Sequence, residues 1–431
     1  MSDGYKVRNL VFQSGERFPV LQNKKTGIPL FEPTLFVLNE LRSLNRASAT
    51  LLQATRAVMV ALQVLDHLKI DLSARFNEGR VLELGEIEAF VRLCGFTQDA
   101  INQLDAPVAA TAKPIKVVSL EKARMRVREL HEQPVVSADT AVIRLMYIRD
   151  YVAWLARRKL LSLTSRHPMY IPLSTTSQLV VGMLSERIPS SNGRSSLGQR
   201  QGMTKAEIER LLEVIDPASP DNPWKNRHVQ VRNQLIFHWL LSLGLRKSEL
   251  LVIKLADIDL RSNEVTVPRR ADDPEELRKD SPNTKTKDRL LSLGSTLANM
   301  TREYILGARK TVGNARRHPY FIVATGTGKP LTKSAVNKLF VELRRKVPGL
   351  PEELTPHVLR YTWNDAFSEQ MDSMKVEPAE EERMRKQQMG WSDNSKMASH
   401  YTKRHTEKKA KEASLALQAK MHTKPETKYE T

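Results

Sequence analysis

The stretch HVLRYTW, residues 357–363, places a histidine and an arginine at the start of a predicted helix. Thr355 is a favourable N-cap residue, and Pro356 suits the first helical position. His357 and Arg360 are three residues apart, so both lie on one face of that helix. Free N–H groups, the helix dipole and an arginine fork all favour an anion such as phosphate there. Taken alone, the stretch is more simply a helix end with two solvated polar side chains.

The charge of the chain points to a polyanionic partner. Its 431 residues include 68 Lys and Arg against 49 Asp and Glu, a net charge of +19, and 40% of them are hydrophobic. A chain of this length can form two or three domains, and its basic character favours nucleic acid first and an anionic membrane surface second. No apolar run approaches a membrane span and the N-terminus has no apolar signal core, so we expect a soluble, intracellular protein.

The single cysteine, Cys94, can form neither an internal disulfide nor a zinc cluster. It lies in the apolar stretch AFVRLCGF, and we expect it to be buried without a functional role. The sequence shows no carboxylate triad and no Cys/His cluster either. We therefore expect no metal ion and no cofactor.

The first half of the chain is predicted to be mostly helical. Residues 1–32 are mixed, with a turn at Lys24–Gly27. Apolar residues recur at helical spacing from Pro33 to Leu72, and a second helix covers about Glu86–Leu93. The segment Ala106–Val118 breaks this pattern and has the composition of a loop.

The next long helix is predicted at Ser137–Leu161. One of its sides is apolar, and the other is basic, with Arg144, Arg149, Arg157, Arg158 and Lys159. Such a side is either a solvated face or, in a protein this basic, a face turned toward DNA. The Ser/Gly-rich, basic stretch SSNGRSSLGQRQG, residues 190–202, follows and is predicted to be a linker.

A second domain begins at Met203, with Thr204 capping the helix KAEIERLLEVI. Further helices are predicted at Asn233–Leu243, which ends at Gly244, and at Glu249–Ile258. Two strands are predicted, EVTVPRR (264–270) and DRLLSL (288–293), separated by an acidic insertion or long turn, ADDPEELRKD (271–280). Helices dominate the remainder, and the Lys-rich tail after Thr402 is helical at first.

Two segments of this domain bring basic side chains to turns or edges. In LSLGLRKSELL, Arg246 lies in a turn between two helices, and Glu249 three residues on can hold a basic group in place. In TKTKDRLLSL, Lys285 and Lys287 alternate along a strand, so they face one way. Each segment also has an ordinary interpretation, as a helix corner or as a lysine-protected strand edge.

A further segment, MGWSDNSKMASHYTKR, begins at Met389. Gly390 and Trp391 are predicted to form a turn, and a helix then leads to Tyr401. Both aromatic side chains could also simply pack in a core.

In this order and at these distances, the four segments resemble the catalytic domain of the tyrosine recombinases, the phage integrase family. The corresponding stretches are GLRKSELL, TKTK, HVLRYTW and GW…MASHY, within about Thr204–Arg404. The chain departs from the family pattern in a charged insert, KVEPAEEERMRKQQ, before Gly390, and in a spacing from Trp391 to Tyr401 that is one residue longer than usual.

The resemblance implies a mainly α fold with a small antiparallel β-sheet in the C-terminal domain. A helical core-binding domain would precede a tyrosine-recombinase catalytic domain. The expected divisions are an N-terminal segment or arm (1–32), a core-binding domain (33–189), a linker (190–202), a catalytic domain (203–404), and a tail that contacts a neighbouring protomer (405–431).

The resemblance also implies roles for the proton-transfer groups. Tyr401 would be the nucleophile, forming a 3′-phosphotyrosyl bond and releasing a 5′-hydroxyl. His357 would accept or share the tyrosine proton, since a histidine side chain can both accept and donate a proton near neutral pH. Lys285 would protonate the leaving 5′ oxygen, with Lys287 as the alternative.

The remaining roles concern the charge on the phosphate. Arg246 and Arg360 would bind the non-bridging oxygens, where negative charge develops in the transition state. Trp391 would donate its indole N–H to a phosphate oxygen, and Glu249 would support an arginine or the lysine. Neither metal nor ATP is required, because the phosphotyrosyl bond conserves the energy of the broken bond.

The function implied is that of a site-specific DNA recombinase, an integrase of a mobile element. Its partners would be double-stranded DNA, three further copies in a homotetramer on two DNA sites, and an accessory directionality factor, without a membrane. We expect it in the cytoplasm, associated with the nucleoid when bound to DNA. The alternatives are a type IB topoisomerase, a hairpin telomere resolvase, or a non-catalytic DNA-binding protein that keeps the fold.

Overall fold

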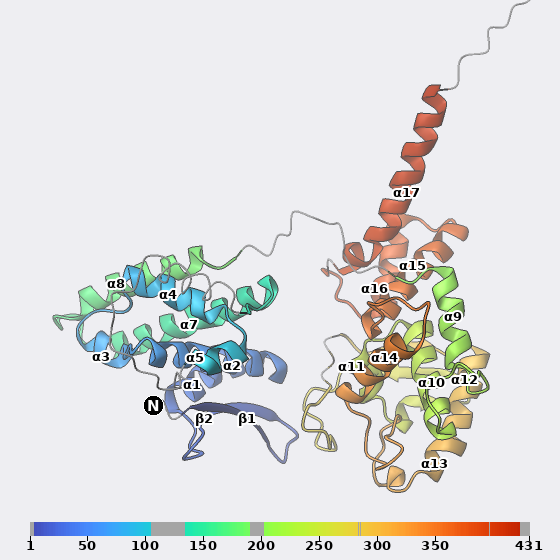
Figure 1. Ribbon diagram of the computed structural model, residues 1–431, viewed down its shortest axis with the longest axis horizontal. Helices are drawn as coiled ribbons and strands as arrows, with labels where there is room; N and C mark the ends of the chain where they lie inside the picture. Colours follow the sequence, from blue (N-terminus) through green and yellow to red (C-terminus); the bar gives the residue numbers. More distant parts are fainter. Residues whose placement is uncertain are drawn as a thin grey trace, which may run out of the picture. The chain divides into compact units, whose positions relative to one another are not determined.

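The computed structural model describes residues 4–104, 134–189, 202–282, 284, 286–395 and 397–422, shown in Figure 1. The chain divides into two compact units, Met1–Ser196 and Leu197–Thr431. The predicted loop Ala106–Val118 and all of the predicted linker before Gly202 lie outside the described residues, as does Lys285.

The N-terminal unit is a helical bundle with a β-hairpin. The hairpin pairs β1 with β2 in antiparallel register, so that Tyr5 is opposite Asn23 and Val11 is opposite Arg17. Helix α1 continues directly into a π-helical segment at Val37–Arg42. The bounds are β1 Tyr5–Val11, β2 Arg17–Asn23, α1 Phe31–Phe36, α2 Ser48–His67, α3 Leu72–Asn77, α4 Leu84–Cys94, α5 Gln98–Leu104, α7 Ala138–Leu161 and α8 Tyr170–Glu186.

Several predicted elements of this unit are confirmed and one is wrong. The helices near 86–93 and 137–161 correspond to α4 and α7, and the turn at Lys24–Gly27 is present, with Gly27 at φ +70°. The continuous helix predicted for Pro33–Leu72 is interrupted before α2. Asn45 there adopts the left-handed region at φ +56°, which asparagine tolerates better than most residues and which a helix cannot include. The hairpin and α8 were not predicted.

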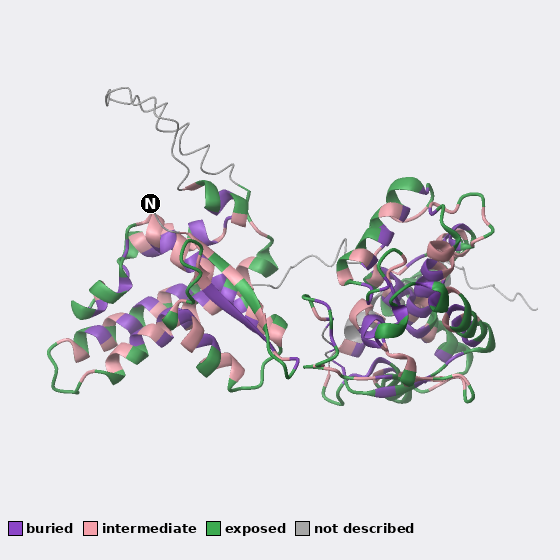
Figure 2. Cartoon of the chain, turned by 90° about the horizontal axis from the view of Figure 1, so that it is seen from below, coloured by how far each residue is buried: buried purple, intermediate pink, exposed green. Residues whose placement is uncertain are grey.

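The hairpin belongs to the core of the N-terminal unit. Phe18 and Leu21 of β2 pack with Phe36, Tyr151 and Trp154, which come from α1 and α7. The burial of β2 contrasts with the exposed side of β1 (Figure 2). Residues 4–32 therefore fold onto the helical unit, and whether the N-terminal segment 1–32 also binds a separate DNA arm site stays a prediction.

A second core cluster joins α2, α4, α7 and α8. Cys94 lies within it, fully buried, and burial raises the pKa of its thiol. Among the described residues, α2 alone is long and apolar enough to cross a membrane, and half of that stretch is buried in this unit. Contrary to the prediction, α2 is thus an apolar run of membrane-span length, and core packing accounts for its hydrophobicity.

Most of the arginine side chains on the basic side of α7 have hydrogen-bond or ion-pair partners within the unit. Arg157 and Arg158 form ion pairs with Glu40 and Glu32, and Arg149 pairs with the adjacent Asp150. Arg144 instead donates to the backbone carbonyls of Cys94 and Phe96, at 2.8 and 2.6 Å.

In the C-terminal unit, helices surround a three-stranded antiparallel sheet with the strand order β3-β4-β5. Its main core contains Phe237, Trp239, Tyr304, Phe321 and Phe340. The bounds are α9 Lys205–Ile215, α10 Arg227–Leu243, α11 Lys247–Val252, β3 Ile258–Asp259, β4 Glu264–Val267, β5 Arg289–Ser292, α12 Ser295–Glu303, α13 Arg309–Thr311, α14 Lys333–Lys346, α15 Pro356–Ser373, α16 Pro378–Met389 and α17 Met397–His422. The fold is thus mainly α with small antiparallel sheets, as predicted for this domain.

Local signals account for most of these elements. The Thr204 side chain caps α9, accepting from the backbone N–H of Glu207, as predicted. Helix α10 ends at Gly244, whose φ of +59° lies in the left-handed region. Strands β4 and β5 confirm the two predicted strands. The helix predicted at Glu249–Ile258 is wrong in extent, because α11 ends at Val252, Ile253 is extended, and Ile258 begins β3.

Candidate active site

Arg246 is held at the start of α11 by Glu249. The backbone N–H of Arg246 donates to Glu249 Oε2 at 3.0 Å, and its guanidinium donates to Oε1 at the same distance. The preceding Gly244 permits the sharp turn, since a Cβ there would lie 2.8 Å from the ring of Trp363. One carboxylate therefore fixes both the backbone and the side chain of Arg246.

Arg360 reaches the same carboxylate from α15. The Thr355 side chain caps this helix, accepting from the backbone N–H of Val358. The Arg360 side chain is fully buried. Its Nη1 donates to the carbonyl of Gly244 at 2.5 Å and lies 3.7 Å from Glu249 Oε2. The two arginines of the sequence pattern thus meet at Glu249.

Two further side chains, Thr286 and Arg289, also bind Glu249. Arg289 at the start of β5 donates to Oε2 at 2.8 Å, and the hydroxyl of Thr286 donates to Oε1 at 2.9 Å. Sequence analysis missed both. Their signal was position. They lie on either side of Lys287 within residues 284–289, the hairpin segment that leads into β5, and Arg289 begins the alternation of inward and outward residues along β5.

Glu249 remains ionised in this environment. Burial raises the pKa of its carboxyl group, but Arg289, Arg360 and Arg246 outweigh burial and lower the pKa to about 2. Three guanidinium groups share this one carboxylate, which leaves an excess of two positive charges. Excess charge that is shielded from water attracts an anion more strongly than it would at an open surface.

A cavity of about 490 Å³ opens beside this cluster. Its basic and polar lining comes from α11, α14 and the start of α15, and it includes Arg246, Lys247, Arg344, Thr355, His357 and Arg360. His357 is exposed, and its ring centre lies 6.4 Å from that of Tyr361. The cavity can therefore admit a phosphate group to both arginines and to His357.

The Gly390–Trp391 turn joins the hairpin segment to Arg360. The backbone N–H of Lys287 donates to the carbonyl of Gly390 at 2.8 Å. Gly390 has φ +65°, and a Cβ there would lie 2.8 Å from the carbonyl oxygen of Lys287. The buried ring of Trp391 lies 5.6 Å from the guanidinium carbon of Arg360. The turn therefore places Trp391 against the arginine that faces the cavity.

The structure describes one of the two candidate lysines, Lys287. The ammonium of Lys287 forms an exposed ion pair with Asp393 at 3.4 Å. Lys285 lies outside the described residues, so the choice between Lys285 and Lys287 stays a prediction.

The start of α17 packs against the same turn. Ala398 is buried in a small cluster with Met389 and Trp391. The backbone of Tyr401 follows one helical turn after Ala398, and its side chain is outside the described part of the structure. Packing of α17 thus brings the Tyr401 segment to the cluster that contains Trp391.

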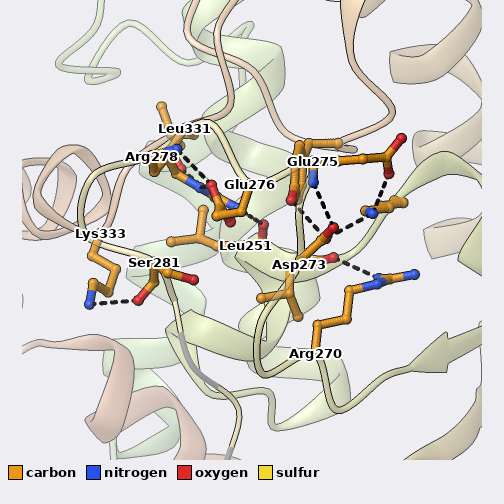
Figure 3. A network of polar contacts seen from close by, with 12 residues as sticks. Leu251, Arg270, Asp273, Glu275, Glu276, Arg278, Ser281, Leu331 and Lys333 are labelled. Atoms are coloured by element: carbon orange, nitrogen blue, oxygen red, sulfur yellow. Dashed lines mark hydrogen bonds and ion pairs between the residues drawn. The ribbon is translucent and has the colours of Figure 1, made fainter. Parts of the chain in front are cut away.

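The acidic insertion between β4 and β5 is an anchored, ordered connection (Figure 3). Arg278 and Glu276 form an almost fully buried ion pair, and Arg278 donates to the carbonyls of Leu251 and Leu331 at 2.9 and 2.8 Å. The ammonium of Lys333 donates to the carbonyl of Ser281 at 3.1 Å. These contacts fix the chain just before it enters the segment that contains Thr286.

The charged insert before Gly390 forms α16 and is attached to α15 by Arg385. This fully buried guanidinium donates to the side-chain oxygen of Asn364 at 2.8 Å and to the hydroxyl of Ser368 at 2.6 Å. Asn364 in turn donates to the carbonyl of Arg360 at 2.8 Å. The insert is therefore bonded to the helix that carries Arg360.

The structure brings five of the predicted residues to one place: Arg246, Glu249, His357, Arg360 and Trp391. Lys287 reaches it through its backbone. Residues 201–408 match the model of the phage integrase family. This part of the chain is thus a phage integrase domain, the catalytic domain type of the tyrosine recombinases.

Individual relatives are distant. Tyrosine recombinase XerD of Listeria monocytogenes is 24% identical over 169 residues, which cover 38% of this chain and 49% of that protein. Tyrosine recombinase XerC of Halalkalibacterium halodurans is 24% identical over 260 residues, or 58% and 77% of the two chains. The chain spans about half the length of the XerD relatives it matches. A fragment of the Tn1549 transposon integrase bound to circular intermediate DNA has a TM-score of 0.41 and 17% identity, covering 79% of this chain and 94% of that one.

Proposed function

We propose that this protein is a site-specific DNA recombinase that cleaves and rejoins DNA strands through a 3′-phosphotyrosyl intermediate. The observation that carries the proposal is the binding of Arg246, Arg289 and Arg360 to the single carboxylate of Glu249, beside a cavity that also reaches His357. This arrangement supplies excess positive charge at a site that can admit a phosphodiester.

In the cleavage step, the Tyr401 oxygen attacks the scissile phosphorus, and a Tyr401–phosphate bond replaces the bond to the 5′ oxygen. His357 accepts the tyrosine proton, and Lys285, or Lys287, donates a proton to the departing 5′ oxygen. Religation is the reverse reaction with a 5′-hydroxyl of the same or another strand. Since one phosphodiester is exchanged for another, no external energy source takes part.

The arginines act on the non-bridging oxygens. Arg246 and Arg360 bind more strongly as negative charge accumulates on the phosphate in the transition state. Glu249 orients both guanidinium groups while leaving the site positive. Trp391, which lies against Arg360, donates its indole N–H to a phosphate oxygen.

The proposed partners are double-stranded DNA carrying the target site, three further protomers in a tetramer on two sites, and an accessory directionality factor. The protein would serve a mobile element in the cytoplasm, with residues 33–189 binding the core of the DNA site. The outer part of α17 supports contact with a neighbouring protomer, since Leu415, Leu417 and Met421 expose 54%, 54% and 73% of their surface.

The test is covalent capture of the intermediate. The protein is mixed with supercoiled plasmid that carries the DNA flanking its own gene, and the reaction is stopped with SDS. We expect a protein–DNA adduct without added metal or ATP, and none with Tyr401→Phe. An adduct that persists in Tyr401→Phe would identify another nucleophile, and tight binding without an adduct would favour a non-catalytic DNA-binding protein. Relaxation of plasmids without any such site would favour a type IB topoisomerase.

A further inference from the structure

A polar groove lies in the N-terminal unit between the β-hairpin and α2, with a volume of about 810 Å³. Its walls come from β1, α2, α5 and the start of α7. None of its lining residues is an aspartate or glutamate, whereas it contains four basic side chains, Lys6, Lys24, Arg56 and Arg144. Two other cavities of this unit include carboxylates, Glu32, Asp66 and Asp71 in one and Glu40 and Asp150 in the other.

Three of these basic side chains are available to a ligand. Lys6, Lys24 and Arg56 are exposed, and none of them forms an ion pair within the described residues. On α7 of the same unit, by contrast, Arg157 is paired with Glu40 and Arg158 with Glu32. Unneutralised cations on one acid-free wall favour a polyanion.

A cluster of amide side chains lines the groove. Gln98 donates to Gln63 Oε1 at 2.8 Å and to Asn102 Oδ1 at 3.1 Å, and Gln63 donates to the same Asn102 oxygen at 3.2 Å. These contacts hold the three amides together and leave Asn102 Nδ2 and Gln98 Oε1 as a donor and an acceptor. Adenine presents an acceptor and a donor in the major groove, so these two groups can each pair with its edge.

The spacing of these groups suits a duplex. Arg56 and Gln63 are seven residues apart on α2, so they are separated by two turns, or about 10.5 Å along the helix axis. The major groove of B-DNA is about 12 Å wide. The separation of Arg56 and Gln63 is of the same order as this width, so one groove of a duplex can contact both side chains at different points.

We infer that this groove binds double-stranded DNA, with Lys6, Lys24 and Arg56 on phosphates and Gln63, Gln98 and Asn102 on base edges. The inference deepens the proposed function, because it locates part of the selection of the target site. It also assigns the N-terminal hairpin to the same duplex as α2. A hairpin bound to a separate arm site would leave Lys6 and Lys24 without a contact to this duplex.

The first experiment selects bound sequences from a random duplex library with full-length protein. We expect the wild type to enrich a motif and the double variant Gln63→Ala/Gln98→Ala to lose the preference at one or two positions, with affinity for the wild-type motif reduced about 5- to 150-fold. Gln178→Ala, an exposed glutamine in an acid-containing cavity, is the matched control and should retain the motif. An unchanged motif in the double variant, or no motif for the wild type, would overturn the assignment of base contacts.

The second experiment tests the phosphate contacts. Lys6→Gln and Arg56→Gln should each weaken binding to selected and scrambled duplexes alike, and lower the slope of log K against log salt by about 0.9. Arg166→Gln, an exposed arginine outside the groove, should bind as the wild type does. Wild-type salt dependence in both groove variants would show that DNA does not occupy the groove.

Covalent capture separates the two proposals. Loss of sequence preference in the groove variants without any adduct from the wild type would support the groove and contradict strand cleavage. An adduct with unchanged preference in the groove variants would do the reverse.

Discussion

Arg289 of β5 donates a 2.8 Å hydrogen bond to Glu249 of α11, forty positions earlier in the chain. Both side chains are buried, and Glu249 also holds Arg246 and lies near Arg360. This pair therefore links the hairpin segment that contains the candidate lysines to the two arginines of the cavity.

Replacing Glu249 should destabilise the C-terminal unit. Glu249→Gln keeps the size of the side chain but leaves Arg246, Arg289 and Arg360 without their shared counter-ion. We expect a loss of about 3 kcal/mol at pH 7, from the depression of the Glu249 pKa to about 2. Urea unfolding measures it, and Glu209→Gln, which removes only an exposed pair with Lys205, should change little. Equal stability of the two variants would contradict the central role of Glu249.

The same residue predicts a pH dependence. The pKa of Glu249 is lower in the folded state than its ordinary value of 4.5, so its stabilisation is complete above about pH 4.5 and disappears as pH falls toward 2. The difference in unfolding free energy between wild type and Glu249→Gln should therefore be constant from pH 7 to 5 and shrink below pH 4.5. Acid titrations of both proteins in urea measure this difference. A difference that shrinks already between pH 7 and 5 would assign the effect to another group.

Loss of Arg289 should affect cleavage more than binding. Arg289→Met removes the bond between the hairpin segment and Glu249, so the candidate lysine is less well placed while the DNA-binding surface persists. We expect the rate of single-turnover cleavage to fall at least tenfold with DNA affinity changed less than threefold. Leu290→Ala, on the exposed side of the same strand, is the control. If affinity and rate fall together, the hairpin segment at residues 284–289 has unfolded instead.

Arg385 should act through Asn364. Arg385→Met leaves buried polar groups on Asn364 and Ser368 without their donor and loosens α16, so Trp391 is held less firmly against Arg360. We expect slower cleavage and a stability loss of about 1–3 kcal/mol. Arg383→Met, exposed on the same helix, provides the comparison. If both variants cleave DNA at the same rate, α16 does not position the site.

Removal of the outer part of α17 should impair assembly. A chain ending before Lys408 retains the turn of α17 that packs on Trp391 but loses the exposed Leu415, Leu417 and Met421. Binding to a single DNA site should persist, whereas synapsis of two sites should weaken strongly. Native gels with one-site and two-site DNA distinguish the two steps. Synapsis at wild-type protein concentrations by the shortened chain would exclude this role of the tail.

Sequence alone determined the elements that depend on neighbouring residues. Thr204 caps α9, Gly244 ends α10, and Thr355 with Pro356 begins α15, because capping and left-handed turns are decided within a few positions. The resemblance of the ordered segments to the tyrosine recombinases likewise pointed to Arg246, Glu249, His357, Arg360 and Trp391, which the structure brings together.

Only the tertiary structure decided how these segments are held in register. The contacts of Glu249 with Arg289 and Thr286, the burial of Arg385 against Asn364, and the folding of the N-terminal hairpin onto α2 and α7 each join residues far apart in the chain. The partners of a buried carboxylate depend on which groups the fold brings within bonding distance and on the free-energy cost of leaving a buried charge unpaired. Neither quantity follows from the local sequence, so the residues that organise the site emerge only when the chain is folded.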